Sequence, residues 1–256
     1  MSNRCRAGQA VLAAALLVSG CGDAPATRHD PAVAATATSA PVIGLTTSLP
    51  LLWQESESVA QLLNDKRPAH WALGVLREHG EVRPLDSLAD QSGALPLPAA
   101  GWLVLAQPYP LSPHENVALD NWVRGGGRLL LFADPMLTQD SAYALGDRRR
   151  PQAVILLSPI LDHWGLELRF DDNQPRGERV VTADQATIPV NLPGVFAVNG
   201  KDADCTLAAQ GLIASCTIGR GRVVAVADAA VLEQVPGDVA EIRKSALRAL
   251  LNRLGT

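Results

Sequence analysis

The chain has no excess of positive charge and, after residue 21, no long apolar run. Its 22 lysines and arginines are outnumbered by 26 acidic residues, which gives a formal net charge of −4. A mildly acidic chain offers no electrostatic reason to bind nucleic acid. A membrane-spanning helix needs about 20 consecutive apolar residues, and no segment after residue 21 supplies them. We therefore expect no nucleic-acid partner and no membrane span in this part of the chain.

The sequence also lacks the motifs of a nucleophilic enzyme. It contains no Gly-x-Ser-x-Gly, and the apolar run 102–106 leads into Gln107 and Pro108 where an elbow nucleophile would stand. Ser48 has no assignable histidine partner, and we expect the scattered histidines to be surface residues: His29, His70, His79, His114 and His163. We therefore predict no enzyme, no catalytic residue and no cofactor, with an unrecognised hydrolase as a remaining alternative.

The first twenty residues carry the most specific signal that is present. Two arginines precede an apolar run over residues 10–18, and the run ends in Val18-Ser19-Gly20-Cys21. A basic start, a short apolar core and small residues at a cleavage site are typical of a secretory signal peptide. Val-Ser-Gly-Cys resembles the lipobox of bacterial lipoproteins, which implies cleavage before Cys21 and lipid on Cys21. The alternative is an ordinary signal peptide that contains a cysteine. A membrane anchor is not expected, because the run is too short to span a membrane.

This interpretation divides the chain into three parts. We expect a signal peptide over residues 1–20 and a flexible tether over residues 21–40, which are rich in Ala, Thr, Pro and Asp. A single α/β domain should then occupy residues 41–256, with a β-rich insertion near residues 171–217. The predicted location is the cell envelope, with the domain held on a membrane by its N-terminal lipid and facing the periplasm.

The two remaining cysteines are spaced as a disulfide-bonded hairpin. If Gln210 and Gly211 form a two-residue turn, Cys205 and Cys216 face each other across the strands. Directly opposed residues lie about 4.5–5.5 Å apart at Cα, which is within disulfide range. Disulfides persist outside the cytoplasm, so we predict a bond between these cysteines. Two buried thiols and a metal pair are the alternatives, but no further cysteine or histidine has ligand spacing nearby, so we expect no metal.

Apolar runs alternate with helical patterns along the rest of the chain. The runs at 42–45, 81–85, 102–106, 128–133 and 222–227 predict strands, and Pro84 should confine the second to an edge or an end. Helical patterns cover residues 56–80, 112–124, 153–165 and 238–254, and Ser112, Pro113 and Glu115 form a helix-start signature. The alternation predicts an α/β fold with a mostly parallel sheet and helices on both faces. Residues 179–216 read as short antiparallel strands that include the cysteine hairpin.

Two stretches resemble a known family. They are residues 111–135, with Leu-Asp-Asn-Trp-Val-Arg-Gly-Gly-Gly-Arg-Leu-Leu-Leu-Phe-Ala-Asp-Pro, and residues 218–228, with Ile-Gly-Arg-Gly-Arg-Val-Val-Ala-Val-Ala-Asp. They look like the domain shared by gliding-motility lipoproteins, ABC-transporter auxiliary proteins and intraflagellar-transport proteins. The resemblance implies a flavodoxin-like or class I glutamine-amidotransferase-like fold. It also implies a non-catalytic accessory protein associated with an ABC-type transport system, whose subunits would be partners.

Polar residues follow the predicted strands where each strand ends. In open α/β sheets, ligands bind beyond the carboxyl ends of the strands. These strand-end residues are Thr46, Thr47, Ser48, Gln107, Asp134 and Asp228, with Trp53 and Glu55 shortly after the first strand. Hydroxyls, carboxylates and an indole suit a sugar or peptide, so a periplasmic glycan- or peptide-binding module is the alternative function. Asp134 and Asp228 are equally typical of helix caps and turns.

Overall fold

The computed structural model describes residues 41–56, 67–200, 204–235 and 239–255. These residues belong to one unit that spans Ser39–Thr256. Cys21, the expected signal peptide and the expected tether lie outside the described residues, as do residues 57–66 of the first helical pattern. Among the described residues, no helix combines the length and the apolar character that a membrane crossing requires.

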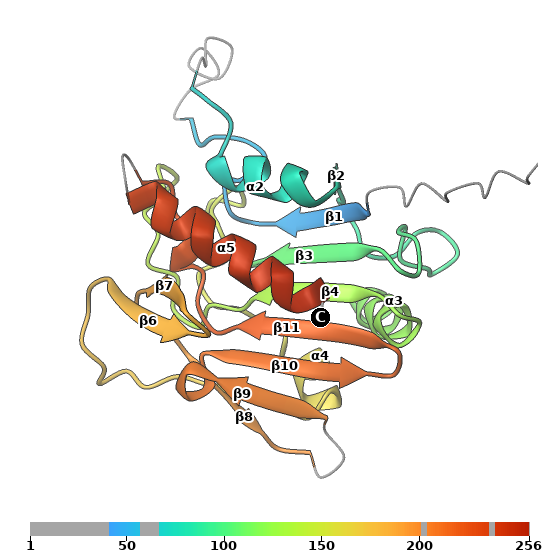
Figure 1. The fold of residues 1–256 in the computed structure, drawn as a ribbon. Coiled ribbons are helices and arrows are strands. Elements are labelled where there is room, and N and C mark those ends of the chain that lie inside the picture. The colour runs from blue at the N-terminus through green and yellow to red at the C-terminus, as the bar shows by residue number, and fades with distance from the viewer. Residues whose placement is uncertain (1–40, 57–66, 201–203, 236–238, 256) are drawn as a thin grey trace, which may run out of the picture. The chain divides into compact units, whose positions relative to one another are not determined.

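A seven-stranded sheet forms the centre of the domain (Figure 1). Its order is β2-β1-β3-β4-β11-β10-β9, and the first five strands in this order run parallel to one another. The parallel strands are β1 (Val42–Thr47), β2 (Glu81–Pro84), β3 (Trp102–Ala106), β4 (Arg128–Phe132) and β11 (Gly221–Val226). The mixed α/β fold with a mostly parallel sheet is therefore confirmed. β2 forms one edge of the sheet, where the missing N–H of Pro84 costs no ladder bond.

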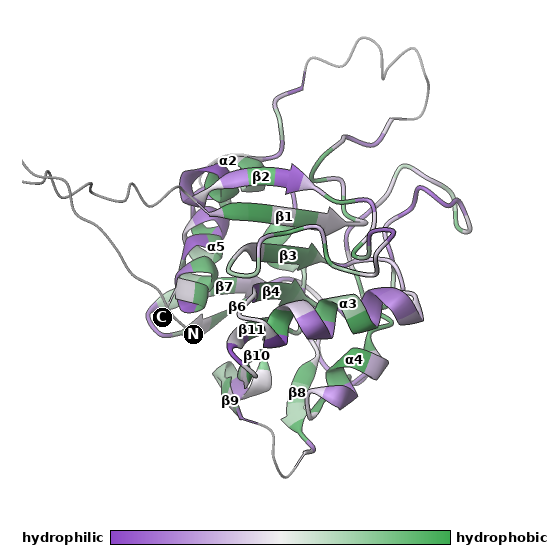
Figure 2. Cartoon of the chain, turned by 90° about the vertical axis from the view of Figure 1, so that its right-hand side faces the viewer, coloured by the Kyte–Doolittle hydropathy of each residue, from purple (hydrophilic) through white to green (hydrophobic). Residues whose placement is uncertain are grey.

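Helices cover both faces of this sheet (Figure 2). Helices α2 (Trp71–His79) and α5 (Val239–Gly255) lie on one face, and α3 (Pro113–Arg124) and the short α4 (Ser158–His163) lie on the other. Burial from both sides explains why β3, β4 and β11 are continuous apolar runs. The residues from Leu129 to Ala133 are all at most 1% exposed.

Helix α3 begins and ends as its sequence predicts. The Ser112 side chain accepts from the Glu115 N–H, the Glu115 side chain accepts from the Ser112 N–H, and Pro113 occupies the first turn. Gly125 caps the helix, and Gly126 has a φ of +116° that favours glycine. A Cβ on Gly127 would lie 2.4 Å from the Trp122 ring, so this turn needs a glycine to pack against the helix.

The helical pattern over residues 153–165 was too long. Only α4 is helical, and the chain before it takes another role, because the Ile155 N–H donates to the Asp134 carbonyl across the end of β4. Pro159 lacks an N–H and fits only the first turn of a helix, so the helix begins next to it.

The β-rich segment near residues 171–217 is not one small insertion. Strands β6 (Arg179–Ala183) and β7 (Ala186–Val190) form a separate hairpin, and β8 (Val195–Val198) pairs with β5 (Leu166–Arg169). Strands β9 (Cys205–Ala208) and β10 (Ile213–Ile218) instead extend the main sheet antiparallel to β11. β10 joins the main sheet because its buried residues continue the core of β11.

The predicted disulfide is present between Cys205 and Cys216, whose Cα atoms are 4.0 Å apart. The pairing register is the predicted one, with Cys216 opposite Cys205 and Ile213 opposite Ala208. The turn itself differs, because the 3₁₀ turn η1 (Ala209–Gly211) and Leu212 together separate the strands. A loop of four residues has the same centre as the expected turn of two, so the register is unchanged.

Candidate ligand pocket at the carboxyl edge

The structure brings the predicted strand-end residues together at the carboxyl edge of the sheet. Thr47, Ser48, Gln107, Asp134 and Asp228 are all at most 8% exposed. Thr46 lies beside them and donates its hydroxyl to the Leu85 carbonyl at 3.1 Å. Trp53 and Glu55 lie outside this cluster, and Trp53 is 40% exposed. Sequence reasoning therefore located the edge correctly, since parallel strands end on the same side.

The buried polar groups of this cluster bind the protein's own backbone. Ser48 Oγ donates to the Gln107 carbonyl and accepts from the Gln152 N–H at 2.9 Å. The Gln107 amide accepts from the Asp134 N–H at 2.8 Å and donates to the Asp134 carbonyl at 2.9 Å. Thr47 Oγ1 accepts from the Leu49 N–H at 2.9 Å. These bonds hold together the loops that leave β1, β3 and β4.

The two buried aspartates bind four backbone N–H groups. Asp134 accepts from Met136 at 2.8 Å and from Ala229 at 3.1 Å. Asp228 accepts from Ala230 at 2.5 Å and from Asn191 at 2.8 Å. Each carboxyl thus fixes its own turn and one neighbouring loop, as the turn-forming interpretation of these residues expected.

Burial perturbs the ionisation of this acidic group. Loss of hydration raises the pKa of Asp134 from 3.8 to about 6, against the opposing effect of its two N–H donors. Burial and, next, the nearby Asp134 raise the pKa of Asp228 well above its ordinary value. Burial also raises the pKa of Glu233, which follows the 3₁₀ turn η2 (Ala230–Leu232). The strand ends therefore hold carboxyl groups that resist ionisation.

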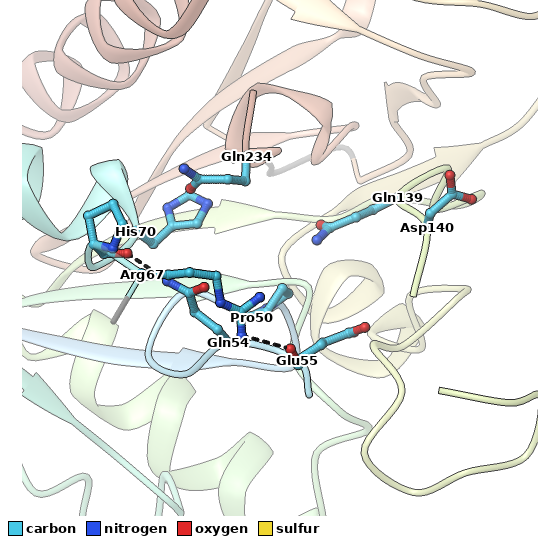
Figure 3. Close-up of a pocket in the computed structure, with 9 residues that line it drawn as sticks. Pro50, Gln54, Glu55, Arg67, His70, Gln139, Asp140 and Gln234 are labelled. Carbon is cyan, nitrogen blue, oxygen red and sulfur yellow. Dashed lines mark hydrogen bonds between the residues drawn. The ribbon is translucent and has the colours of Figure 1, made fainter. Parts of the chain in front are cut away.

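A pocket of about 360 Å³ opens outside this cluster (Figure 3). Its walls come from the loops that follow β1, β4 and β11 and from the residues that precede α2. The lining residues are Pro50, Gln54, Glu55, Arg67, Pro68, His70, Gln139, Asp140 and Gln234. Glu55 is thus the one predicted site residue among them. The rest are loop residues without periodicity or motif, which is why sequence reasoning missed them.

Several lining side chains are committed to the pocket's own structure. The Glu55 carboxylate accepts from the Ser141 hydroxyl at 2.9 Å and from the Ala142 N–H at 2.6 Å. Gln54 donates to the Pro68 carbonyl at 2.6 Å, and Arg67 donates to the Glu55 carbonyl at 3.0 Å. These bonds join the loop after β1 to the loop after β4 and to the chain before α2.

His70 corrects the expectation that every histidine is a surface residue. It is 6% exposed and caps α2, where its Nδ1 accepts from the Ala72 N–H at 3.2 Å. Burial lowers its pKa from 6.5 to about 4, and a hydrogen bond to the Leu232 backbone only partly opposes this shift. His70 is therefore neutral at physiological pH, and its ring is bonded to the backbone of Ala72 and of Leu232.

Two amides in the pocket have no such commitment. Neither Gln139 nor Gln234 forms a side-chain hydrogen bond with another residue in the described part of the chain. Gln139 extends from the loop after β4 toward the other lining residues, and Gln234 comes from the loop after β11 (Figure 3). A primary amide both donates and accepts, so this pair can bind a ligand that presents both kinds of group.

The lining residues do not form a metal site or a nucleophilic site. Among the described residues, no three His, Cys, Asp or Glu side chains are grouped to hold a metal ion. The described residues that line the pocket include no Ser, Thr, Cys, Tyr or Lys, and the lining histidine is held by backbone bonds. The arrangement is suited to binding a polar molecule by hydrogen bonds.

No family model matches the sequence, and no curated protein does. Among solved structures, an exo-β-1,4-mannosidase from Opitutaceae bacterium strain TAV5 is 16% identical with a TM-score of 0.49, over 84% of this chain and 36% of that one. A β-galactosidase from Halorubrum lacusprofundi is 16% identical with a TM-score of 0.44, over 85% of this chain and 30% of that one. A putative ThuA-like protein from Bacteroides uniformis is 10% identical with a TM-score of 0.42, over 84% of this chain and 89% of that one.

The chain spans about a third of the length of the two glycosidases it matches. At these identities and TM-scores, the similarities support no argument about activity. The resemblance to gliding-motility and ABC-auxiliary domains stays a prediction, as do the absence of enzymatic activity and the lipid anchor.

Proposed function

We propose that this chain is a lipid-anchored, non-catalytic accessory protein of the cell envelope whose α/β domain binds a polar ligand in the carboxyl-edge pocket. The observation that carries the binding role is the pair of uncommitted amides, Gln139 and Gln234, in a pocket where His70 is already bound to the backbone. The lipobox at Cys21 supports the anchor, and the resemblance of residues 111–135 and 218–228 supports association with an ABC-type transport system.

The strand order supports a flavodoxin-like fold. Numbered along the chain, the five parallel strands follow the order 2-1-3-4-5, which is the flavodoxin-like order. Such sheets bind ligands beyond the carboxyl ends of their strands. The pocket lies on this side, beside the loop that leaves β1.

A glycan fragment is the ligand class that we propose. Sugar hydroxyls donate and accept, which matches the amides of Gln139 and Gln234. Trp53 follows β1 in the loop that also supplies Gln54, and its indole is 40% exposed, so it is available to pack against a sugar ring. A peptide would use the same amides, and it is the second candidate.

A glycan array tests the binding role. We expect the domain to retain glycans, and the double substitution Gln139→Ala with Gln234→Ala to abolish retention while the unfolding midpoint stays unchanged. Gln91→Ala is the matched control, because Gln91 is an exposed glutamine in a loop outside the pocket. Equal retention by the double variant and the wild type would contradict the assignment of the pocket.

Metabolic labelling with a fatty acid tests the anchor separately. We expect the wild-type chain and Cys5→Ala to acquire label and to fractionate with membranes, and Cys21→Ala to do neither. Crosslinking of the labelled protein should then capture transporter subunits. Label on Cys21→Ala would refute the lipidation site, and capture of envelope glycan alone would remove the transporter association.

A further inference from the structure

The two uncommitted amides of the pocket come from different loops, so their spacing depends on what joins those loops (Figure 3). Gln139 lies in the loop after β4, and Gln234 lies in the loop after β11. Glu233 precedes Gln234, and its carboxylate accepts from the Thr138 hydroxyl at 3.3 Å. Thr138 in turn precedes Gln139, so this side-chain bond joins the two loops at positions adjacent to both amides.

Glu233 is itself held by two helices. The Trp71 indole N–H of α2 donates to the Glu233 backbone carbonyl at 3.2 Å. The Glu233 carboxylate lies 3.8 Å from the guanidinium of Arg243 in α5. Burial raises the pKa of Glu233, and the charge of Arg243 and the Thr138 hydroxyl oppose that rise. The backbone and the side chain of Glu233 are thus each fixed by a separate helix.

The burial of Arg243 makes it costly for Glu233 to move away. The Arg243 side chain is fully buried, and its Nε has no hydrogen-bond partner among the described residues. Its other acidic partner, Glu178, is 40% exposed. A buried cation that loses an acidic partner is destabilised, because water cannot take the partner's place. We therefore expect Glu233 to stay beside Arg243 and to act as the fixed side of its bond to Thr138.

Gln139 lies between two anchored positions of its loop. On its amino side, Thr138 donates to Glu233, and on its carboxyl side, Ser141 donates to Glu55 at 2.9 Å. Thr138 is the nearer of these two in sequence, and it is the one that reaches the loop of Gln234. The place of the Gln139 amide relative to the Gln234 amide therefore depends on the Thr138–Glu233 bond.

We propose that Glu233 is a positioning residue of the pocket, whose bond to Thr138 sets the spacing of the Gln139 and Gln234 amides. This inference rests on the proposed function only in treating the two amides as the groups that bind a ligand. With the bond in place, a sugar meets both amides in loops that are already ordered. Without the bond, binding must first order the loop of Gln139, and this cost lowers the affinity.

Hydrogen exchange of the unliganded full chain tests the positioning role. The Leu137 N–H precedes Thr138 and donates to the Ala153 carbonyl at 2.9 Å, so its exchange reports the opening of this loop. We expect Thr138→Val to speed exchange at Leu137 about two- to tenfold, which is the effect of one lost hydrogen bond on local opening. Exchange in β3 and the unfolding midpoint should stay unchanged. Thr138→Ser keeps the hydroxyl and should exchange as the wild type does.

Thr182→Val is the matched control, because Thr182 is an exposed threonine of β6 outside the pocket. Equal exchange at Leu137 in Thr138→Val and in the wild type would overturn the proposal, as would an equal change in Thr182→Val. If Thr138→Val fails to fold, Glu233→Ala and Glu233→Gln give the same comparison, because only glutamine keeps an acceptor for the Thr138 hydroxyl. Equal exchange in these two variants would also contradict the positioning role.

The glycan array separates this inference from the proposed function. Glycans that the wild type retains should be retained less by Thr138→Val and equally by Thr138→Ser. Unchanged retention alongside faster exchange would overturn the positioning role and leave the binding role intact. Retention of no glycan by the wild type would instead remove the binding role, and the exchange experiment would still decide whether Glu233 joins the two loops.

Discussion

Two buried groups, His70 in the pocket and Asp134 at the strand ends, should contribute opposing pH dependences to the stability of the protein between pH 4 and pH 6. His70 has a pKa lowered from 6.5 to about 4, and Asp134 has a pKa raised from 3.8 to about 6. The stability that neutral His70 contributes is present above pH 6.5 and is lost as the pH falls toward 4. The stability that neutral Asp134 contributes is present below pH 3.8 and is lost as the pH rises through 6. The two slopes therefore oppose each other.

The contributions of His70 and Asp134 to the unfolding free energy are similar in magnitude. Each of these two pKa shifts changes the unfolding free energy by about 3 kcal/mol across the full pH range between the unfolded and the folded pKa. Removing one group should expose the slope of the other. For His70→Asn, we expect the free energy of unfolding, relative to the wild type, to fall by about 3 kcal/mol from pH 4 to pH 7. For Asp134→Asn, we expect the free energy of unfolding, relative to the wild type, to rise by about 3 kcal/mol over the same pH range.

Urea unfolding followed by tryptophan fluorescence, at half-unit steps of pH, measures these differences. Asparagine at position 70 keeps an acceptor for the Ala72 N–H, so the cap of α2 survives while the titration is removed. For His70→Asn, Asp228 and the exposed carboxylates contribute equally to the variant and to the wild type and cancel in the difference. A His70→Asn profile parallel to that of the wild type would refute the reasoning, because it would mean that His70 ionises freely in the folded state.

Three further predictions concern the fold. The double substitution Cys205→Ala with Cys216→Ala should lower the unfolding free energy by about 3 kcal/mol, because the bond closes a loop with a separation of 11 residues in the unfolded chain. Reductant should lower the unfolding free energy of the wild type by the same amount. No change under reductant would show that the bond is absent in solution. Ser112→Ala should cost about 1 kcal/mol in urea unfolding and Ser112→Thr much less, because only alanine lacks the capping oxygen; equal losses would argue against the cap. Gly127→Ala should destabilise by about 1–3 kcal/mol through the Trp122 clash, whereas Gly74→Ala, with open space in α2, should stabilise by roughly 0.5–1 kcal/mol; the opposite signs in a thermal melt are the test.

Local signals in the sequence predicted the elements that local chemistry determines. Ser112, Pro113 and Glu115 lie within four positions, so the start of α3 follows from their spacing alone. The shared edge of Gln107, Asp134 and Asp228 followed from strand direction. Strand direction did not predict where these side chains point, because Gln107 adopts a φ of +49° that turns its amide onto Asp134.

The pocket depended on contacts between distant segments. His70 is buried and bonds to the backbone of Leu232, far along the chain, and nothing within its own helical pattern marks it as internal. Gln139 and Gln234 belong to loops that meet only after β4 and β11 have paired. Sequence patterns predict faces of helices and strands, whereas loop residues acquire their neighbours from the completed sheet.

The placement of β1 also has a mechanical consequence. The described chain enters the sheet at the amino end of β1, and the pocket opens beyond the carboxyl end of the same strand. A pull applied between the entry point and a bound ligand would therefore act along β1. Such a load is a shear, in which the ladders to β2 and β3 must rupture together rather than unzip one bond at a time. The ladders on both sides of β1 therefore resist tension along the line that joins the N-terminal side of the domain to the pocket.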